Sequence, residues 1–141
     1  MTVKNCVVRG FNTGIGLDFS NNNILESNTA SDNTFGISLF NSNKNNLVNN
    51  RVSSNDVGIS LHESEDNNLA GNIADGNIDL GISIAAPTGG NNFERNTAIN
   101  TKGTADYPGT DFSCGDFPNK DLGGNVCGTQ SRCESWLTSC P

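Results

Sequence analysis

The candidates for acid–base chemistry in this chain are the single histidine, His62, and two of its carboxylates, Asp18 and Glu63. An imidazole titrates near neutral pH, and a carboxylate can exchange a proton or orient the imidazole. Two carboxylates about 5 to 10 Å apart can also hydrolyse a glycosidic bond. Whether these side chains meet depends on the elements that carry them, so the organisation of the chain decides what chemistry they can do.

A repeat of about 22 residues organises most of the sequence. Its first motif is a glycine followed by alternating apolar residues, at positions 14–17, 36–39, 58–61 and 81–84. A second motif, N-x-[LF]-x-x-N-x-[AV], runs in the same register and starts at Asn23, Asn45, Asn67 and Asn91. Two motifs that stay in phase over four copies indicate a repeat architecture.

The spacing within each repeat predicts strands. The apolar residues alternate with a period of two, and Asn, Ser, Asp and Gly separate the short runs, which favours turns between strands. Leucine-rich repeats have a similar length but need a denser leucine pattern. The sequence therefore predicts an all-β fold, a right-handed parallel β-helix (solenoid) of about four to five coils over residues 1–101. Residues 102–141, here called the tail, break the repeat and are expected to form a cysteine-rich C-terminal cap over the exposed last coil.

Stacked coils bring equivalent positions into columns about 4.8 Å apart. Five inward apolar columns are expected: Ile15, Ile37, Ile59, Ile82; Leu17, Leu39, Leu61, Ile84; Leu25, Leu47, Leu69, Phe93; Ala30, Val52, Ala74, Ala98; and Phe35, Val57, Leu80. The asparagines at 23, 45, 67 and 91, and those at 28, 50, 72 and 96, are expected to form hydrogen-bonded ladders. Val3 to Thr13 reads as part of an earlier coil with one inserted residue.

The alternate positions of the glycine-led strand face outward. One outward column contains Ser60, and the next contains Asp18, Phe40, His62 and Ala85. Asp18 and His62 are then two coils, or about 10 Å, apart, too far for a hydrogen bond. Phe40 between them could stack on a sugar ring, with Lys44, Ser60, His62 and Glu65 as partners for its hydroxyl groups. The alternative interpretation is a solvated surface without a ligand.

These repeats resemble the parallel β-helix repeats of the pectin-lyase-like superfamily, above all the Asn-rich repeats of NosD and of carbohydrate-processing β-helices. The segment GISLFNSNKNNLVNNRVSSNDVGISLHESEDNNLAGN carries the resemblance, which extends over roughly residues 3–101. It implies the fold and a ligand along an outward strand face. It does not imply one activity, because such coils serve lyases, hydrolases, epimerases, adhesins and spacers. Leu61-His62-Glu63 lacks the Asp-Pro that would precede it in an epimerase-like motif.

The cysteines indicate the compartment. Cys114, Cys127, Cys133 and Cys140 lie close together near the C-terminus, which favours disulfides and an extracellular or periplasmic location, although no signal segment precedes the repeats. Zinc binding and free thiols are the alternatives, and the spacings match no C-x-x-C zinc site. We expect two disulfides, with Cys127–Cys133 favoured by proximity and Cys6 left free.

Composition limits the partners. A formal charge of −7 argues against nucleic acid, and no apolar run is long enough for membrane insertion. One histidine and one methionine make a copper site doubtful, so we expect no metal and no cofactor. The sequence predicts a non-enzymatic extracellular module that binds polysaccharide or has a structural or assembly role. The alternative is a small polysaccharide-active enzyme, of lyase, hydrolase or epimerase type, that uses the outward surface around His62.

The N-terminal end predicts assembly. Val3 already belongs to a coil, so the first coil would present apolar core and unpaired strand edges. Either further residues precede this end or a second copy covers it. We expect a homo-oligomer, most simply a dimer with two-fold symmetry through residues 1–20, and side-by-side packing through the Phe40 face is the alternative. Light scattering on this chain should give twice the monomer mass, and Val3→Glu should dissociate the dimer. A clean monomer at high micromolar concentration would refute the interpretation.

The columnar register predicts the cost of a core truncation. Leu39 and Leu61 should be fully buried, so Leu61→Ala should lower the free energy of unfolding by about 2–5 kcal/mol. Urea denaturation measures this change. A cost near zero would show that Leu61 does not face the core and that the register is wrong.

Overall fold

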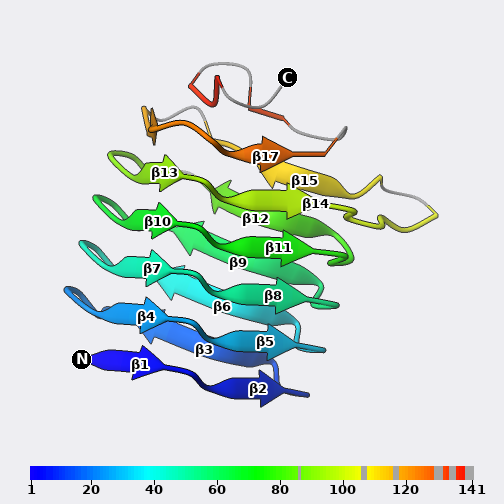
Figure 1. Cartoon of the computed structure of the whole chain (residues 1–141), viewed down its shortest axis with the longest axis horizontal. Coiled ribbons are helices and arrows are strands. Elements are labelled where there is room, and N and C mark those ends of the chain that lie inside the picture. The colour runs from blue at the N-terminus through cyan, green and yellow to red at the C-terminus, as the bar shows by residue number, and fades with distance from the viewer. Residues whose placement is uncertain (86, 106–107, 116–117, 129–131, 134–135, 139–141) are drawn as a thin grey trace.

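The coils of the chain stack so that their strands form three parallel β-sheets (Figure 1), which enclose one apolar core. The computed structural model describes residues 1–85, 87–105, 108–115, 118–128, 132–133 and 136–138. Sheet A contains β1 (Thr2–Lys4), β4 (Ile24–Glu26), β7 (Asn46–Val48), β10 (Asn68–Ala70), β13 (Asn92–Glu94) and β16 (Lys120–Asp121). Sheet B contains β2 (Val7–Arg9), β5 (Thr29–Ser31), β8 (Arg51–Ser53), β11 (Ile73–Asp75), β14 (Thr97–Ile99) and β17 (Val126–Cys127). Sheet C contains β3 (Thr13–Asp18), β6 (Phe35–Phe40), β9 (Val57–His62), β12 (Leu80–Ala85) and β15 (Thr110–Ser113).

The strand pairing confirms the parallel β-solenoid. Leu39 pairs with Leu61, and Phe40 pairs with His62, each 22 positions further along the chain. The first coil obeys the same spacing, since Val3 pairs with Leu25 and Val8 with Ala30. The expected inserted residue in that coil is therefore wrong. At the N-terminal end of the stack, the outer edges of β1, β2 and β3 have no paired strand in the described part of the chain; the dimer through this end stays a prediction.

Four of the five expected apolar columns form the core. Leu39 and Leu61 are fully buried, as predicted. The fifth column does not belong to the core, because its members are only half-buried: Phe35, Val57 and Leu80. The glycine that follows each of them explains the difference, because a Cβ atom on Gly58 would lie 3.0 Å from the core side chain of Val52. The glycine and the next isoleucine are thus both buried, which breaks the alternation and leaves the preceding residue on the outer side.

Buried asparagine ladders connect the coils, as the repeat predicted. The Nδ2 group of Asn50 donates to Oδ1 of Asn72 at 2.9 Å and to the carbonyl oxygen of Leu25 at 2.8 Å. Its Oδ1 accepts from the backbone N–H and the Nδ2 group of Asn28, at 3.0 and 2.9 Å. Each such side chain therefore supplies partners to backbone groups that no strand can satisfy.

Two further ladders were missed by the sequence interpretation. Asn33, Asn55 and Asn77 form a third asparagine ladder. Hydroxyl groups form another, in which the backbone N–H of Ser20, Ser42 and Ser64 donates to the hydroxyl of the next coil, ending at Thr88. These residues also recur at the repeat spacing, but they fall between the two motifs, where asparagine and serine were interpreted only as turn formers.

The corners of each coil are single residues in the left-handed backbone region. In the second coil these are Phe19, Asn22, Ser27 and Asp32, with φ between 46° and 58°. Each directly precedes a ladder residue, so a sharp corner turns the next side chain inward. Most corner positions in the chain hold Asn, Asp, Ser or Gly, which tolerate this backbone.

The coils continue past residue 101, where the repeat motifs end. In the tail, β15, β16 and β17 each add a strand to one sheet. Trp136 lies against Phe93 and Phe112, with ring centroids 5.0 and 6.3 Å away, and Leu137 is buried beside this group. The division into coils at 1–101 and a cap at 102–141 stays a prediction.

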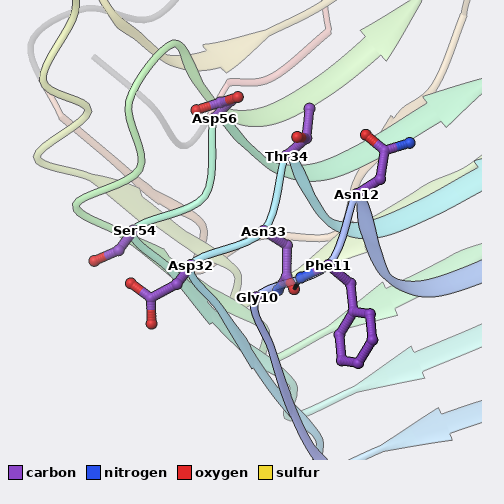
Figure 2. A pocket seen from close by; sticks show the side chains of 8 residues that line it. All are labelled: Gly10, Phe11, Asn12, Asp32, Asn33, Thr34, Ser54 and Asp56. Atoms are coloured by element: carbon purple, nitrogen blue, oxygen red, sulfur yellow. Dashed lines mark hydrogen bonds between the residues drawn. The ribbon is translucent and has the colours of Figure 1, made fainter.

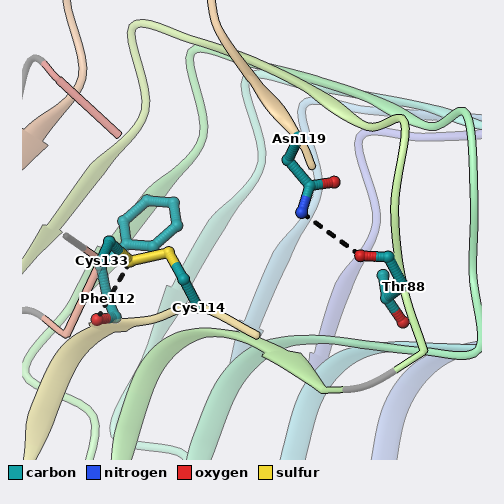
Figure 3. Close-up of a disulfide and its surroundings, with 5 residues drawn as sticks. All are labelled: Thr88, Phe112, Cys114, Asn119 and Cys133. Carbon is teal, nitrogen blue, oxygen red and sulfur yellow. Dashed lines mark hydrogen bonds between the residues drawn. A yellow bond between two sulfur atoms is a disulfide. The ribbon is translucent and has the colours of Figure 1, made fainter. Parts of the chain in front are cut away.

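A disulfide fastens this end of the solenoid (Figure 3). It joins Cys114 to Cys133, so the favoured pairing Cys127–Cys133 is wrong. A parallel bridge between Ser113 and Arg132 explains the observed pairing, because it places the residues that follow, Cys114 and Cys133, side by side. Cys127 is also disulfide-bonded, Cys6 is free and exposed, and Cys140 lies outside the described residues.

The ladder predicts that a buried amide contributes more to stability than an exposed one. Asn50→Ala should lower the free energy of unfolding by about 3 kcal/mol, because it leaves buried groups of Asn28 and Leu25 without partners. The matched control is Asn46→Ala, at an exposed position of β7, which should change stability by less than about 0.5 kcal/mol. Equal losses in urea denaturation would show that the ladder is not a stabilising element.

Candidate functional site

The outward column of sheet C brings the expected residues together. Asp18, Phe40 and His62 occupy the last positions of β3, β6 and β9, and Phe40 pairs with both of the others. The imidazole of His62 stacks on the Phe40 ring, with centroids 5.3 Å apart and planes 21° apart. Asp18 and His62 are thus separated by a whole coil, as the register predicted.

A third ring, Phe19, extends this stack at the corner after β3. Its centroid lies 5.7 Å from that of Phe40, and the planes are nearly perpendicular at 86°. Phe19 is 72% exposed and Phe40 is 39% exposed. Because one face of Phe40 is taken by His62, Phe19 offers a ligand more free aromatic surface. Phe19, Phe40 and His62 are called the aromatic strip below.

The backbone of Phe19 is unusual for such a large residue. Its φ is 46°, in the left-handed region, and the equivalent corner residues of the next two coils are Asn41 and Glu63. A bulky residue in this region is strained, and an exposed ring recovers little of that cost by burial. Folding alone therefore does not explain Phe19. The sequence signal that could have found it is an aromatic residue in a corner column otherwise occupied by polar residues.

Polar groups lie beside the aromatic strip. Asn41 donates from Nδ2 to the Oε2 atom of Glu63 at 2.8 Å, so the half-buried carboxylate is held in one place. Lys44 and Glu65 are exposed in adjacent coils, and the backbone N–H of Lys44 donates to the carbonyl oxygen of Glu65. Ser60 lies half-buried in the neighbouring outward column. Asn41 and Glu63, which directly follow Phe40 and His62, thus place an amide and a carboxylate next to the exposed rings.

The arrangement suits binding better than proton transfer. The Nδ1 atom of His62 is buried and, within the described part of the chain, has no hydrogen-bond partner. No carboxylate therefore orients the imidazole through that atom, and Phe40 separates it from Asp18. A catalytic histidine usually has an orienting partner. The roles assigned from the sequence to Asp18, His62 and Glu63 as catalytic candidates stay predictions.

A polar groove lies at the opposite edge of sheet C (Figure 2). Phe11, 62% exposed, stands at the corner between sheets B and C. The groove is also lined by Asn12, Asp32, Thr34, Ser54 and Asp56. It therefore combines an exposed ring, two carboxylates and hydroxyl groups, and it has no lysine or arginine in its lining. The sequence interpretation did not single out these residues.

Comparisons with known proteins place these features in a family. The family model described as "periplasmic copper-binding protein (NosD)" matches residues 1–117. A solved structure of a double mutant of the periplasmic alginate epimerase AlgG is similar, with a TM-score of 0.63 and 24% sequence identity. The similarity covers 89% of this chain and 26% of that one, so this chain spans about a quarter of the epimerase's length. No curated protein matches the chain.

The periplasmic family confirms the extracellular or periplasmic location expected from the cysteines, and the Cys114–Cys133 disulfide agrees with it. No helix in the described part of the chain is long and apolar enough to cross a membrane.

The residues present do not fit the copper of the family's description. Copper sites combine several histidine, cysteine or methionine ligands. Here Cys114, Cys127 and Cys133 are disulfide-bonded, and the only histidine lies against a phenylalanine ring. Among the described residues, no group of three or more His, Cys, Asp or Glu could hold a metal ion.

Proposed function

The chain belongs to the NosD family of periplasmic proteins, and from this premise we propose that it is a non-enzymatic β-solenoid module that binds polysaccharide through the aromatic strip. The observation that supports this most is Phe19, which is 72% exposed and has a strained left-handed backbone. Exposed aromatic surface beside ordered polar groups is typical of a binding site. A sugar ring offers apolar C–H groups to the rings and hydroxyl groups to Asn41 and Glu63.

The rigidity of the coil favours this use. Phe40 and His62 are in strands β6 and β9, and Glu63 is held by Asn41 at 2.8 Å. A preorganised surface loses little conformational entropy when a ligand binds. Outward positions within the strands of sheet C, such as Ser38 and Ser60, add hydroxyl groups beside the rings, which suits a polymer better than a small molecule.

Truncation of the exposed ring tests the proposal. A glycan array identifies the ligand, and titration calorimetry then compares variants. Phe19→Ala should weaken binding about tenfold or more, because exposed aromatic anchors contribute much of the affinity of a site. The matched control is Val7→Ala, which truncates a side chain 64% exposed on sheet B, and it should bind like the unmodified protein.

Two results would contradict the proposal. One is a blank array, which would leave only a structural or assembly role. The other is equal binding by Phe19→Ala and the unmodified protein. Assays for reducing ends and unsaturated uronates on the same glycans distinguish binding from the enzymatic alternative, since turnover that depends on His62 would replace the non-enzymatic part of the proposal.

A further inference from the structure

The five strands of sheet C, β3, β6, β9, β12 and β15, contain no lysine or arginine. Strands of the other two sheets contain Lys4, Arg9, Arg51 and Lys120. The strands that carry the aromatic strip on the outward face of this sheet, β3, β6 and β9, therefore have His62 as their only basic side chain.

Carboxylates lie at both edges of this face. Asp18 is exposed beside Phe19, and Glu63 is held by Asn41. At the other edge, Asp32 and Asp56 line the groove beside Phe11. Each edge therefore pairs an exposed ring with two carboxylates.

Basic side chains lie near this face at Arg9, directly before the Phe11 groove, at Lys44, and at Arg132, whose backbone bridges to Ser113 at the C-terminal end of sheet C. The four carboxylates at the two edges outnumber them. Lys44 and Asp66 occupy equivalent corner positions in adjacent coils, and the backbone N–H of Lys44 donates to the carbonyl oxygen of Glu65. Two carboxylates therefore lie in the coil next to Lys44, and this corner has a net negative charge. Arg51 and Arg95 form ion pairs with Asp75 and Glu94. The whole chain has a formal charge of −7. A polyuronate on this face would meet like charges, which oppose association.

We propose that the ligand of this face is a polymer of protonated amino sugars, which crosses sheet C from the aromatic strip to the Phe11 groove. This inference rests on the proposed function and names its ligand class. Ammonium groups donate hydrogen bonds to the carboxylates at both edges, and a cation is also attracted to the face of an aromatic ring. The strands between the edges have six residues and span about 20 Å, so the ligand is an oligomer rather than a single sugar.

Three matched ligands test the charge of the ligand. Titration calorimetry compares glucosamine oligomers, N-acetylglucosamine oligomers of the same length, and alginate oligomers. Glucosamine oligomers should bind most tightly and alginate least. Raising the salt to about 1 M, where the Debye length falls to about 3 Å, should weaken glucosamine binding and leave N-acetylglucosamine binding nearly unchanged.

Charge-neutral variants test the two edges. Glu63→Gln, and separately Asp32→Asn with Asp56→Asn, should each weaken glucosamine binding about fivefold and weaken N-acetylglucosamine binding much less, because a neutral sugar loses only a hydrogen-bond acceptor and no charge attraction. The matched control is Glu26→Gln, an exposed carboxylate in β4 of sheet A, which should have no effect. Thermal unfolding of each variant shows whether it remains folded.

The outcomes separate the two proposals. If none of the three oligomers binds, this inference fails; if the glycan array is blank as well, the proposed function fails with it. If N-acetylglucosamine or alginate oligomers bind as tightly as glucosamine oligomers and Phe19→Ala weakens them, the strip binds glycans and the amino-sugar inference alone is overturned. Unchanged glucosamine binding by both sets of edge variants also overturns it.

Discussion

The fold depends on one interaction, the hydrogen bonding of buried side chains to backbone groups at the corners of the coils. A coil of 22 residues makes sharp turns, and the backbone groups next to each turn cannot pair within a strand. Asparagine solves this because one amide both donates and accepts, as Asn50 does towards Asn28, Asn72 and Leu25. Removal of one amide leaves several buried groups unpaired, and this cost makes the register of neighbouring coils specific.

The same constraint determines what the surface can do. Because the ladders hold the register, every position of a coil is aligned with its equivalents above and below, and outward residues form columns. The aromatic strip is such an alignment: His62 stacks on Phe40, and Phe19, one residue beyond the strand position equivalent to Phe40, meets the Phe40 ring nearly at a right angle. A binding surface can then arise by substitution in a few outward positions, without change to the core. Phe19 is the position where the surface departs most from what the fold requires.

The sequence predicted much of the fold because its signals are periodic. Two in-phase motifs located the buried column that contains Leu39 and Leu61, and the alternation of residues placed Phe40 beside His62. The prediction that Phe35 is buried was wrong, because a glycine bend interrupts the alternation. The predicted partner of Cys133 was also wrong, because a strand bridge rather than proximity in the sequence determines which cysteines meet. Phe19 was missed because the left-handed corner column that it shares with Asn41 and Glu63 was not identified from the sequence, so an aromatic residue in that column did not stand out.

The most direct measurement of the central claim is an NMR titration that observes His62. It is the only histidine, so its ring signals identify the aromatic strip without ambiguity. Addition of glucosamine oligomers should shift these signals together with the backbone amides of Phe19, Asn41 and Glu63, and leave the amides of sheet A unchanged. Unshifted His62 signals during saturable binding, or shifts confined to sheets A and B, would contradict the account.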